Sequence, residues 1–328
     1  MSTQGFEGKK VLITGGLGFI GSNLARRLAD AGAYVTVVDN LIPECGGNLY
    51  NIDRFDKKIK IHVLDIRNSD MIKSLVECQD FLFNLAGQTS HLDSMENPIQ
   101  DLEINCTAQL SILEACRLYN KTIKIVFTST RQVYGRPDYL PVNEEHPVRP
   151  VDVNGINKMA GEWYHTLYNN VYTIRTSILR LTNTIGPRMR IKDARQTFLG
   201  IWIRRLLEGK PIEVWGGEQQ RDFNYVDDCV DALCLAMNTD SANKKIFNLG
   251  SNEKISLKAL AEMLIKINGS GEYIIKPFPV ERKKIDIGDY YSDYKLIRKT
   301  IGWEPKVSLK EGLIRTLNFY KENLKHYV

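Results

Sequence analysis

Asn154 and Lys158 stand four residues apart in a segment that the sequence predicts to be helical. Residues at this spacing lie on one face of a helix, so the two side chains project toward the same point. An asparagine amide does not titrate and cannot serve as a general base. His91, in the loop after residues 84–88, carries an imidazole, whose ordinary pKa suits proton transfer at neutral pH. His91 is therefore a candidate base, although a polar side chain in the first turn of a helix explains the residue equally well.

Three glycines, Gly15, Gly18 and Gly21, lie between an apolar segment and a helix-length segment near the start of the chain. Glycines at such a junction permit a tight turn and let backbone amides approach a pyrophosphate at the helix N-terminus. Asp39 closes the next apolar segment about 20 residues later, where a carboxylate accepts hydrogen bonds from adenosine ribose hydroxyls and repels a 2′-phosphate. The combination predicts a site for NAD and disfavours NADP.

The elements that must position these residues follow from the order of the apolar segments. Short apolar runs alternate with helix-length segments through the first half of the chain. Strands that are apolar nearly throughout, separated by helices, are typical of a parallel sheet covered on both faces. We therefore expect an α/β fold with a Rossmann-type doubly wound parallel sheet and a smaller C-terminal substrate-binding cap. The NAD-binding domain would comprise residues 1–182, with 222–252 returning to it, and the cap residues 183–221 and 253–328.

The alternation loosens after residue 183. An amphipathic helix is expected in "RQTFLGIWIRRLLEG", a strand-turn-strand unit in "IEVWGGEQQRDFNYV", a helix in "DDCVDALCLAMN" and a short strand in "KIFNLGS". Two further helices are expected from about residue 255 onward.

Composition and charge exclude several classes of protein. The 328 residues carry a net charge of +5, and Lys and Arg are mostly interspersed with Asp and Glu, which argues against nucleic-acid binding. No apolar stretch reaches membrane-spanning length, and the N-terminus lacks the hydrophobic region of a signal peptide. The six cysteines include no Cys-x-x-Cys pair, so we expect reduced core thiols, no metal site and a cytoplasmic protein.

Seven motifs, in order, resemble the extended short-chain dehydrogenase/reductases, and in particular their nucleotide-sugar epimerase/dehydratase branch. They are "TGGLGFIG", "VVDN", "LDIRN", "NLAGQ", "FTSTRQVYG", "RLTNTIGPR" and "RDFNYVDD". "NLAGQ" together with "EINCTAQLSILEA" looks closest to epimerases of nucleoside-diphosphate sugars. The resemblance implies bound NAD, a nucleoside-diphosphate sugar as substrate, and a homodimer formed by helices near 100–118 and 155–170.

The resemblance also implies the catalytic residues and reveals one departure. Family members use a hydroxyl residue, matched by Thr130, and a Tyr and a Lys on the next helix; Lys158 matches the lysine, and Asn154 stands at the tyrosine position. In the family the lysine binds the nicotinamide ribose, and the tyrosine accepts the sugar hydroxyl proton as hydride leaves. Tyr134 is the nearest tyrosine by family position. Three interpretations stay open: a relay water held by Asn154 and Thr130 that passes the proton to bulk or to His91, a base from the cap, or loss of hydride transfer.

Arg131 and Gln132 follow Thr130, where the resembling 4,6-dehydratases carry Asp-Glu as acid and base for water elimination. Without those carboxylates, elimination lacks its acid and base. We therefore expect an NAD-dependent nucleotide-sugar epimerase that acts through a transient keto-sugar. The alternatives are a dehydrogenase that releases the keto-sugar and a catalytically silent protein that binds NAD and a nucleotide sugar.

The resemblance assigns further residues to the ligands. An arginine such as Arg221 suits a diphosphate because a guanidinium binds phosphate oxygens in pairs. Packing explains Trp215 almost as well as a nucleobase pocket does, and a solvated loop explains Arg188 as well as an anion site does. The expected substrate-binding residues are Thr89, Asn183, Arg188, Trp215, Arg221, Arg282 and Asp286. The expected cofactor-binding residues are Gly15, Gly18, Phe19, Ile20, Gly21, Asp39, Asn40, Asp65, Ile66, Leu85, Ala86, Gly87, Thr128 and Lys158.

Overall fold

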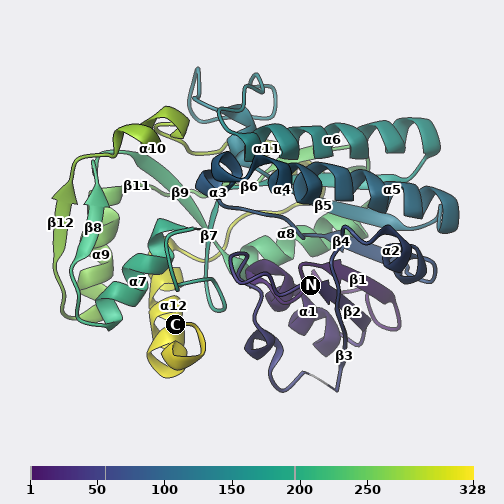
Figure 1. Cartoon of the computed structure of the whole chain (residues 1–328), viewed down its shortest axis with the longest axis horizontal. Helices are drawn as coiled ribbons and strands as arrows, with labels where there is room; N and C mark the ends of the chain where they lie inside the picture. The colour runs from purple at the N-terminus through teal and green to yellow at the C-terminus, as the bar shows by residue number, and fades with distance from the viewer. Residues whose placement is uncertain (1, 56, 196) are drawn as a thin grey trace.

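A computed structural model describes residues 2–55, 57–195 and 197–328, and Figure 1 shows its layered arrangement of helices and strands. At its centre is a seven-stranded sheet of order β10-β6-β5-β4-β1-β2-β3, in which all neighbouring strands are parallel. The predicted Rossmann-type doubly wound sheet is confirmed. Its strands are β1 (Lys10–Thr14), β2 (Tyr34–Asp39), β3 (Ile59–Val63), β4 (Phe81–Asn84), β5 (Lys124–Thr130), β6 (Arg175–Leu181) and β10 (Ile246–Asn248).

Helices cover both faces of this sheet. On β1, Val11 and Ile13 join one buried apolar cluster and Leu12 joins another, as the alternation of side chains along a strand requires. The first cluster is completed by helices α1 (Phe19–Asp30) and α8 (Val226–Asn238), and the second by α2 (Ser69–Val76) and α5 (Ala108–Tyr119). The strands are apolar nearly throughout because both of their faces are buried. The long helix α6 (Val153–Tyr172) packs beside α5 and on β5.

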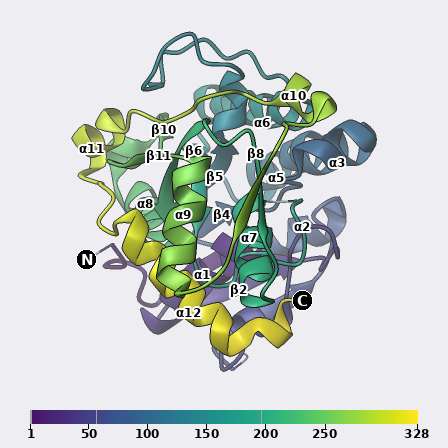
Figure 2. The same ribbon diagram turned by 90° about the vertical axis from the view of Figure 1, so that its left-hand side faces the viewer.

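The cap contains two small sheets and lies at the left of Figure 1, facing the viewer in Figure 2. A three-stranded sheet has the order β11-β9-β7, and β12 pairs with β8 in a two-stranded sheet. These strands are β7 (Asn183–Ile185), β8 (Ile212–Trp215), β9 (Gln220–Tyr225), β11 (Lys254–Ser256) and β12 (Tyr273–Lys276). The later helices are α7 (Phe198–Leu207), α9 (Leu257–Asn268), α10 (Val280–Ile285), α11 (Lys295–Ile301) and α12 (Leu309–Asn323).

Three features of the second half differ from expectation. The two strands of "IEVWGGEQQRDFNYV" form, but β8 pairs with β12 while β9 pairs with β7 and β11. Because β9 belongs to the cap, the chain returns to the large sheet with α8 rather than at residue 222. Four helices, not two, follow residue 255, since α10 and α11 are too short for a sequence period to reveal them. Gln196, in the predicted segment of α7, lies outside the described residues.

Within the described ranges, no helix is both long and apolar enough to cross a membrane. The same ranges contain no group of three or more His, Cys, Asp or Glu side chains that could hold a metal ion. Two shorter helices, α3 (His91–Glu96) and α4 (Pro98–Leu102), follow β4 and pack against α6. They bring the loop after β4 to the start of α6.

Candidate active site

A cavity of about 660 Å³ opens where the carboxyl ends of the central strands meet the cap. Its lining includes Gly15 after β1, Leu85 after β4, Thr130 at the end of β5, Leu181 at the end of β6, and Trp215 of the cap. In doubly wound sheets ligands bind at this edge, where the strand order reverses. Here β1 lies between β2 and β4, which is that reversal point. The cavity is therefore the candidate active site.

The turn between β1 and α1 leaves no room for side chains. Gly15 has φ +69°, a conformation that favours glycine, and a Cβ on Gly21 would lie 2.1 Å from the carbonyl oxygen of Gly15. Gly18 is the N-cap of α1 and no side chain caps this helix, so its first backbone amides are left for a ligand. Phe19 and Ile20 line the cavity beside the three glycines. This cradle fits the pyrophosphate of NAD.

Asp39 ends β2 and lines the cavity together with Asn40 and Ile66. Its carboxylate accepts hydrogen bonds from the backbone N of Leu17 at 3.1 Å and of Leu41 at 3.0 Å. Burial raises the pKa of Asp39 above its usual value, against the effect of these backbone hydrogen bonds. Its place one strand away from the glycine turn fits the adenosine ribose of NAD.

Asp65 does not belong to the cavity lining, although the next residue, Ile66, does. Its carboxylate accepts hydrogen bonds from Arg67 Nη2 at 2.7 Å and Asn40 Nδ2 at 2.9 Å. The hydrogen bond from Arg67 is the main reason that the pKa of Asp65 falls to about 2. The expectation that Asp65 binds the cofactor is corrected, because its carboxylate is paired with Arg67 and Asn40 and lies outside the lining.

Lys158 projects from α6 toward the ends of β4 and β5. Its Nζ donates a hydrogen bond to the carbonyl oxygen of Thr128 at 3.2 Å, and a Cβ on Gly87 would lie 2.9 Å from the same Nζ. Burial lowers the pKa of Lys158 to about 8, while Asp101 and Glu162 act in the opposite direction. The cofactor-side residues predicted from the loop after β4 and from β5 all line the cavity with Lys158: Leu85, Ala86, Gly87 and Thr128.

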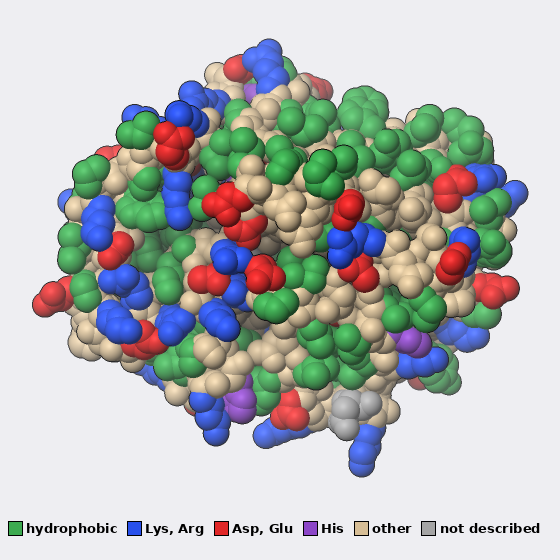
Figure 3. Space-filling model, in the orientation of Figure 1, with side chains coloured by type: hydrophobic (Ala, Val, Ile, Leu, Met, Phe, Trp, Pro, Cys, Tyr) green, Lys and Arg blue, Asp and Glu red, His purple; other side chains and the backbone are tan. Residues whose placement is uncertain are grey.

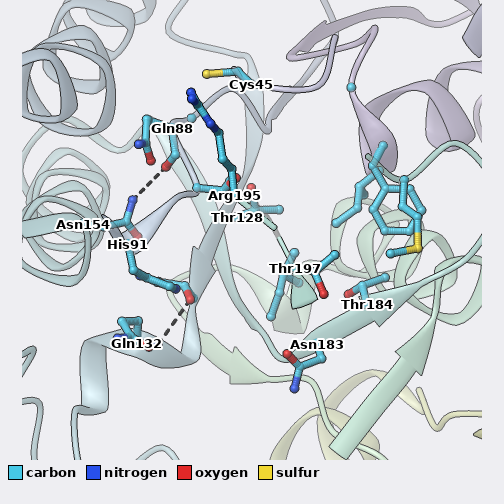
Figure 4. A pocket seen from close by; sticks show the side chains of 18 of the residues that line it. Cys45, Gln88, His91, Thr128, Gln132, Asn154, Asn183, Thr184, Arg195 and Thr197 are labelled. Carbon is cyan, nitrogen blue, oxygen red and sulfur yellow. Dashed lines mark hydrogen bonds between the residues drawn. The ribbon is translucent and has the colours of Figure 1, made fainter. Parts of the chain in front are cut away.

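Asn154 lines the same cavity, but its amide nitrogen already donates hydrogen bonds within the protein. Nδ2 donates to the carbonyl oxygen of Gln88 at 2.7 Å and to Asp101 Oδ2 at 3.1 Å, and only 2% of the residue is exposed. Figure 4 shows the Asn154 amide pointing at Gln88. The buried Asp101 also accepts hydrogen bonds from Asn105 at 3.0 Å and Asn157 at 2.8 Å. Asn154 therefore ties α6 to α4, and only its Oδ1 is left to hold a relay water.

His91 pairs with Asp152 in the cavity wall. His91 Nδ1 lies 2.9 Å from Asp152 Oδ2, and the imidazole is 36% exposed whereas the Asp152 side chain is fully buried. As the N-cap of α6, Asp152 accepts hydrogen bonds from Gly155 N at 2.7 Å and Gln132 Nε2 at 2.7 Å. Burial raises the pKa of Asp152, but the nearby His91 and the hydrogen bonds from Gly155 and Gln132 outweigh it and leave that pKa below its usual value. The carboxylate is held in its charged form at 2.9 Å from Nδ1, although the two groups are not aligned as a hydrogen bond in this structure.

Thr130 lies in the cavity lining, whereas Tyr134 lies in the protein core. Thr130 lines the cavity, where its Oγ1 accepts a hydrogen bond from Gln132 N at 3.2 Å. Tyr134 is fully buried outside the lining; its hydroxyl donates to Asn248 Oδ1 at 2.7 Å and accepts from Arg180 Nη1 at 2.7 Å. Burial raises the pKa of Tyr134 to about 12. The prediction of Tyr134 as a catalytic residue is wrong, because its hydroxyl is part of the core and does not face the cavity.

The cap supplies the opposite wall of the cavity. Arg221 Nη2 lies 3.2 Å from Asp286 Oδ2, and burial lowers the pKa of Arg221 to about 10. The guanidinium of Arg282 stacks 4.2 Å from the centre of the Trp215 ring. Six of the seven predicted substrate residues line the cavity: Thr89, Asn183, Trp215, Arg221, Arg282 and Asp286.

Arg188 is the seventh, and it lies outside the lining. Its Nη1 donates to Asn23 Oδ1 at 2.7 Å, and its guanidinium lies 5.5 Å from the centre of the Phe319 ring. The expectation for Arg188 is corrected, because these contacts hold its guanidinium between α1 and α12. Arg195, from the same basic segment, does line the cavity.

Asp152 and Arg131 carried no predicted ligand role. Asp152 gives a recognisable local signal, an aspartate at the start of a helix, but its pairing with His91 depends on the packing of α3 against α6. Arg131 lines the cavity directly after Thr130. In the sequence, Arg131 was noted only because it stands where the resembling dehydratases carry an aspartate.

Comparisons with known proteins agree with this architecture. Residues 11–250 match the NAD dependent epimerase/dehydratase family. A Methanocaldococcus jannaschii protein provisionally named UDP-glucose 4-epimerase is 35% identical over 318 residues, 95% of this chain and 99% of that protein. UDP-glucuronic acid decarboxylase 1 of Xenopus tropicalis is 31% identical over 329 residues, 97% of this chain and 73% of that protein. The solved structure of Thermotoga maritima UDP-glucose 4-epimerase with UDP-glucose has a TM-score of 0.88 at 31% identity and covers 96% of this chain and 99% of its own. The chain therefore belongs to the NAD-dependent epimerase/dehydratase family, and its cofactor is NAD.

Proposed function

We propose that this chain is an NAD-dependent nucleotide-sugar epimerase in which His91, paired with Asp152, accepts the proton that a tyrosine accepts in the resembling enzymes. One observation carries the proposal: His91 and Lys158 line one cavity, with a buried carboxylate behind His91 Nδ1. A carboxylate at Nδ1 leaves Nε2 as the proton-accepting atom. Among the described residues, Nε2 of His91 has no hydrogen-bond partner, so it is open to a substrate hydroxyl.

Bound NAD supplies the group that takes a hydride from a ring carbon and returns it. The chain handles the proton: His91 Nε2 accepts it from the sugar hydroxyl, and Asp152 stabilises the resulting imidazolium. Thr130 Oγ1 can hydrogen-bond the same hydroxyl, and the positive charge of Lys158 favours the alkoxide character that develops as the proton leaves. Return of the hydride to the opposite face of the transient keto-sugar inverts the carbon.

Water elimination is not part of the proposal. Gln132 commits its amide to Asp152 at 2.7 Å and to the carbonyl oxygen of Ile285 at 3.3 Å. An amide in this position cannot exchange a proton with a sugar carbon. Asp286, a carboxylate of the cap wall, is paired with Arg221.

The proposed substrate is a nucleoside-diphosphate sugar. Arg221 and Arg282 present guanidinium groups that suit a diphosphate. Trp215 and Phe278, whose ring centres lie 6.3 Å apart at 71°, provide aromatic surface for a nucleobase. The relatives above are named as enzymes of UDP sugars, so UDP sugars are the first candidates.

We further propose that the protein is a homodimer. Four apolar side chains at helical spacing on α6 are exposed, from 48% for Ile156 to 67% for Trp163, with Leu167 and Val171 between. Figure 3 shows apolar side chains gathered at the upper right, over α6 and α5. An apolar strip of this kind is typical of an interface, and a second copy of α6 would cover it.

Incubation with NAD and a panel of UDP sugars, followed by NMR of the sugar ring, tests the proposed activity. We expect inversion of one ring carbon without accumulation of NADH absorbance. Accumulating NADH with a released keto-sugar would identify a dehydrogenase instead. Binding of NAD and UDP with no change in any sugar would identify a silent binding protein.

A further inference from the structure

We propose that Arg131 binds a carboxylate on the sugar, so that the substrate is a nucleotide sugar acid. The inference rests on the proposed function and adds the chemical class of the sugar. Arg131 lines the cavity, and its Nε is buried without a hydrogen-bond partner. Within the described part of the chain, no hydrogen bond or ion pair joins its guanidinium to another residue.

The other cavity arginines already have partners. Arg282 stacks on Trp215. The remaining three have carboxylates at short range: Arg195 with Asp93 at 3.6 Å, Arg205 with Glu213 at 3.3 Å and Arg221 with Asp286 at 3.2 Å. Arg131 is therefore a cavity arginine that has an aromatic neighbour, Tyr290, but, among the described residues, no carboxylate at ion-pair distance.

The groups around Arg131 do not neutralise it. Its guanidinium lies 5.7 Å from the centre of the Tyr290 ring, and burial lowers the pKa of Arg131. Asp222 and Asp286 act on its charge only from beyond ion-pair distance. The Asp222 carboxylate accepts hydrogen bonds from Thr182 Oγ1 and, at 3.0 Å, from Ser292 N, and Asp286 is paired with Arg221. A partly buried guanidinium whose Nε has lost water without gaining a partner is costly, so its presence in a ligand cavity indicates an anionic ligand.

The position of Arg131 favours the sugar over the diphosphate as the source of that anion. Arg131 follows Thr130 at the end of β5, on the wall of the sheet where Lys158 and His91 also lie. Arg221 and Arg282 extend from the cap, and Arg221 lies near enough to Arg131 for the two charges to repel each other. A planar guanidinium can bind both oxygens of a carboxylate. A hexuronate carries such a carboxylate on a ring carbon, within the sugar itself.

Calorimetric titration of the NAD-loaded protein with UDP-glucuronate, UDP-glucose and UDP tests this assignment. The first two ligands differ only in the carboxylate that replaces a hydroxymethyl group. We expect the wild-type protein to bind UDP-glucuronate at least about tenfold more tightly than UDP-glucose, as one charge-assisted hydrogen bond allows. Arg131→Met should abolish this preference and leave UDP affinity unchanged, and Arg131→Lys should keep part of the preference. Arg149→Met, at an exposed arginine outside the lining, is the matched control.

Three results would overturn the inference. If the wild-type protein binds UDP-glucose as tightly as UDP-glucuronate, or more tightly, the assignment of Arg131 to a sugar carboxylate fails, whatever the behaviour of the variants. The proposed epimerase function is not affected by that result. If Arg131→Met lowers the affinity for UDP as much as the affinity for UDP-glucuronate, Arg131 binds the diphosphate and its assignment to the sugar fails. If the wild-type protein binds none of the three ligands, the proposed function fails as well.

Discussion

Replacing His91 with glutamine tests the proposed proton acceptor. The substitution removes the imidazole, but Asp152 keeps hydrogen bonds from Gly155 N at 2.7 Å and Gln132 Nε2 at 2.7 Å. Because no buried carboxylate is left unpaired, the free energy of unfolding should change by no more than about 1 kcal/mol. The value of kcat should fall by about 10²- to 10⁴-fold, the usual contribution of a general base.

The assay is steady-state kinetics on the epimerised substrate, with NAD affinity and chemical denaturation measured separately. KM and NAD affinity should change little, because the imidazole is proposed to act on the proton in the transition state. The acid limb of the kcat–pH profile, which an imidazole base generates, should disappear in His91→Gln. The same substitution at His62, on β3 outside the cavity lining, is the control. A fall of less than about threefold in kcat, or an equal fall in the His62 control, would refute the role.

Three further predictions concern α6. Asn154→Tyr should lower the free energy of unfolding by about 1–2 kcal/mol, because it deletes hydrogen bonds to Gln88 and Asp101 whose acceptors keep other donors. The turnover of this variant should be lower than that of the wild-type protein. If the wild-type protein is inactive and the variant gains activity, the wild-type protein is a catalytically silent binding protein. With the pKa of Lys158 lowered to about 8 from 10.5, the NAD-free folded state loses this proton before the unfolded state does, so stability should rise between these pH values. Lys158→Met should flatten that rise in denaturant titrations, and an unchanged slope would contradict the shift. Trp163→Glu should yield a monomer in sedimentation experiments with an unaltered circular dichroism spectrum, whereas a persistent dimer would exclude the α6 interface.

The fold and the cofactor side of the site could be predicted because their signals are local. Gly15 and Gly21 belong to one tight turn, in which a Cβ atom at either position would lie too close to backbone atoms. Asp39 stands at the end of the strand beside that turn, so its distance along the chain is set by one helix and one strand. The apolar strands reveal a sheet buried on both faces, whatever their partners.

The remainder of the site depends on packing that no short segment encodes. His91 meets Asp152 only because α3 packs against the start of α6. Family position placed Tyr134 near the catalytic strand but did not show that its hydroxyl turns to Arg180 in the core. The sheet to which β9 belongs is decided by β7 and β11, which lie far from it in the chain. Arg131 became informative only when its neighbours were known to leave its charge unpaired.

The central claim is that a ring carbon is inverted by hydride transfer to and from bound NAD. NMR of the nucleotide sugar after turnover in D₂O tests it most directly. The account predicts an inverted carbon that retains its original hydrogen, because a hydride held by the cofactor does not exchange with solvent. Deuterium at the inverted carbon, or no inversion in protein that binds both NAD and the sugar nucleotide, would contradict it.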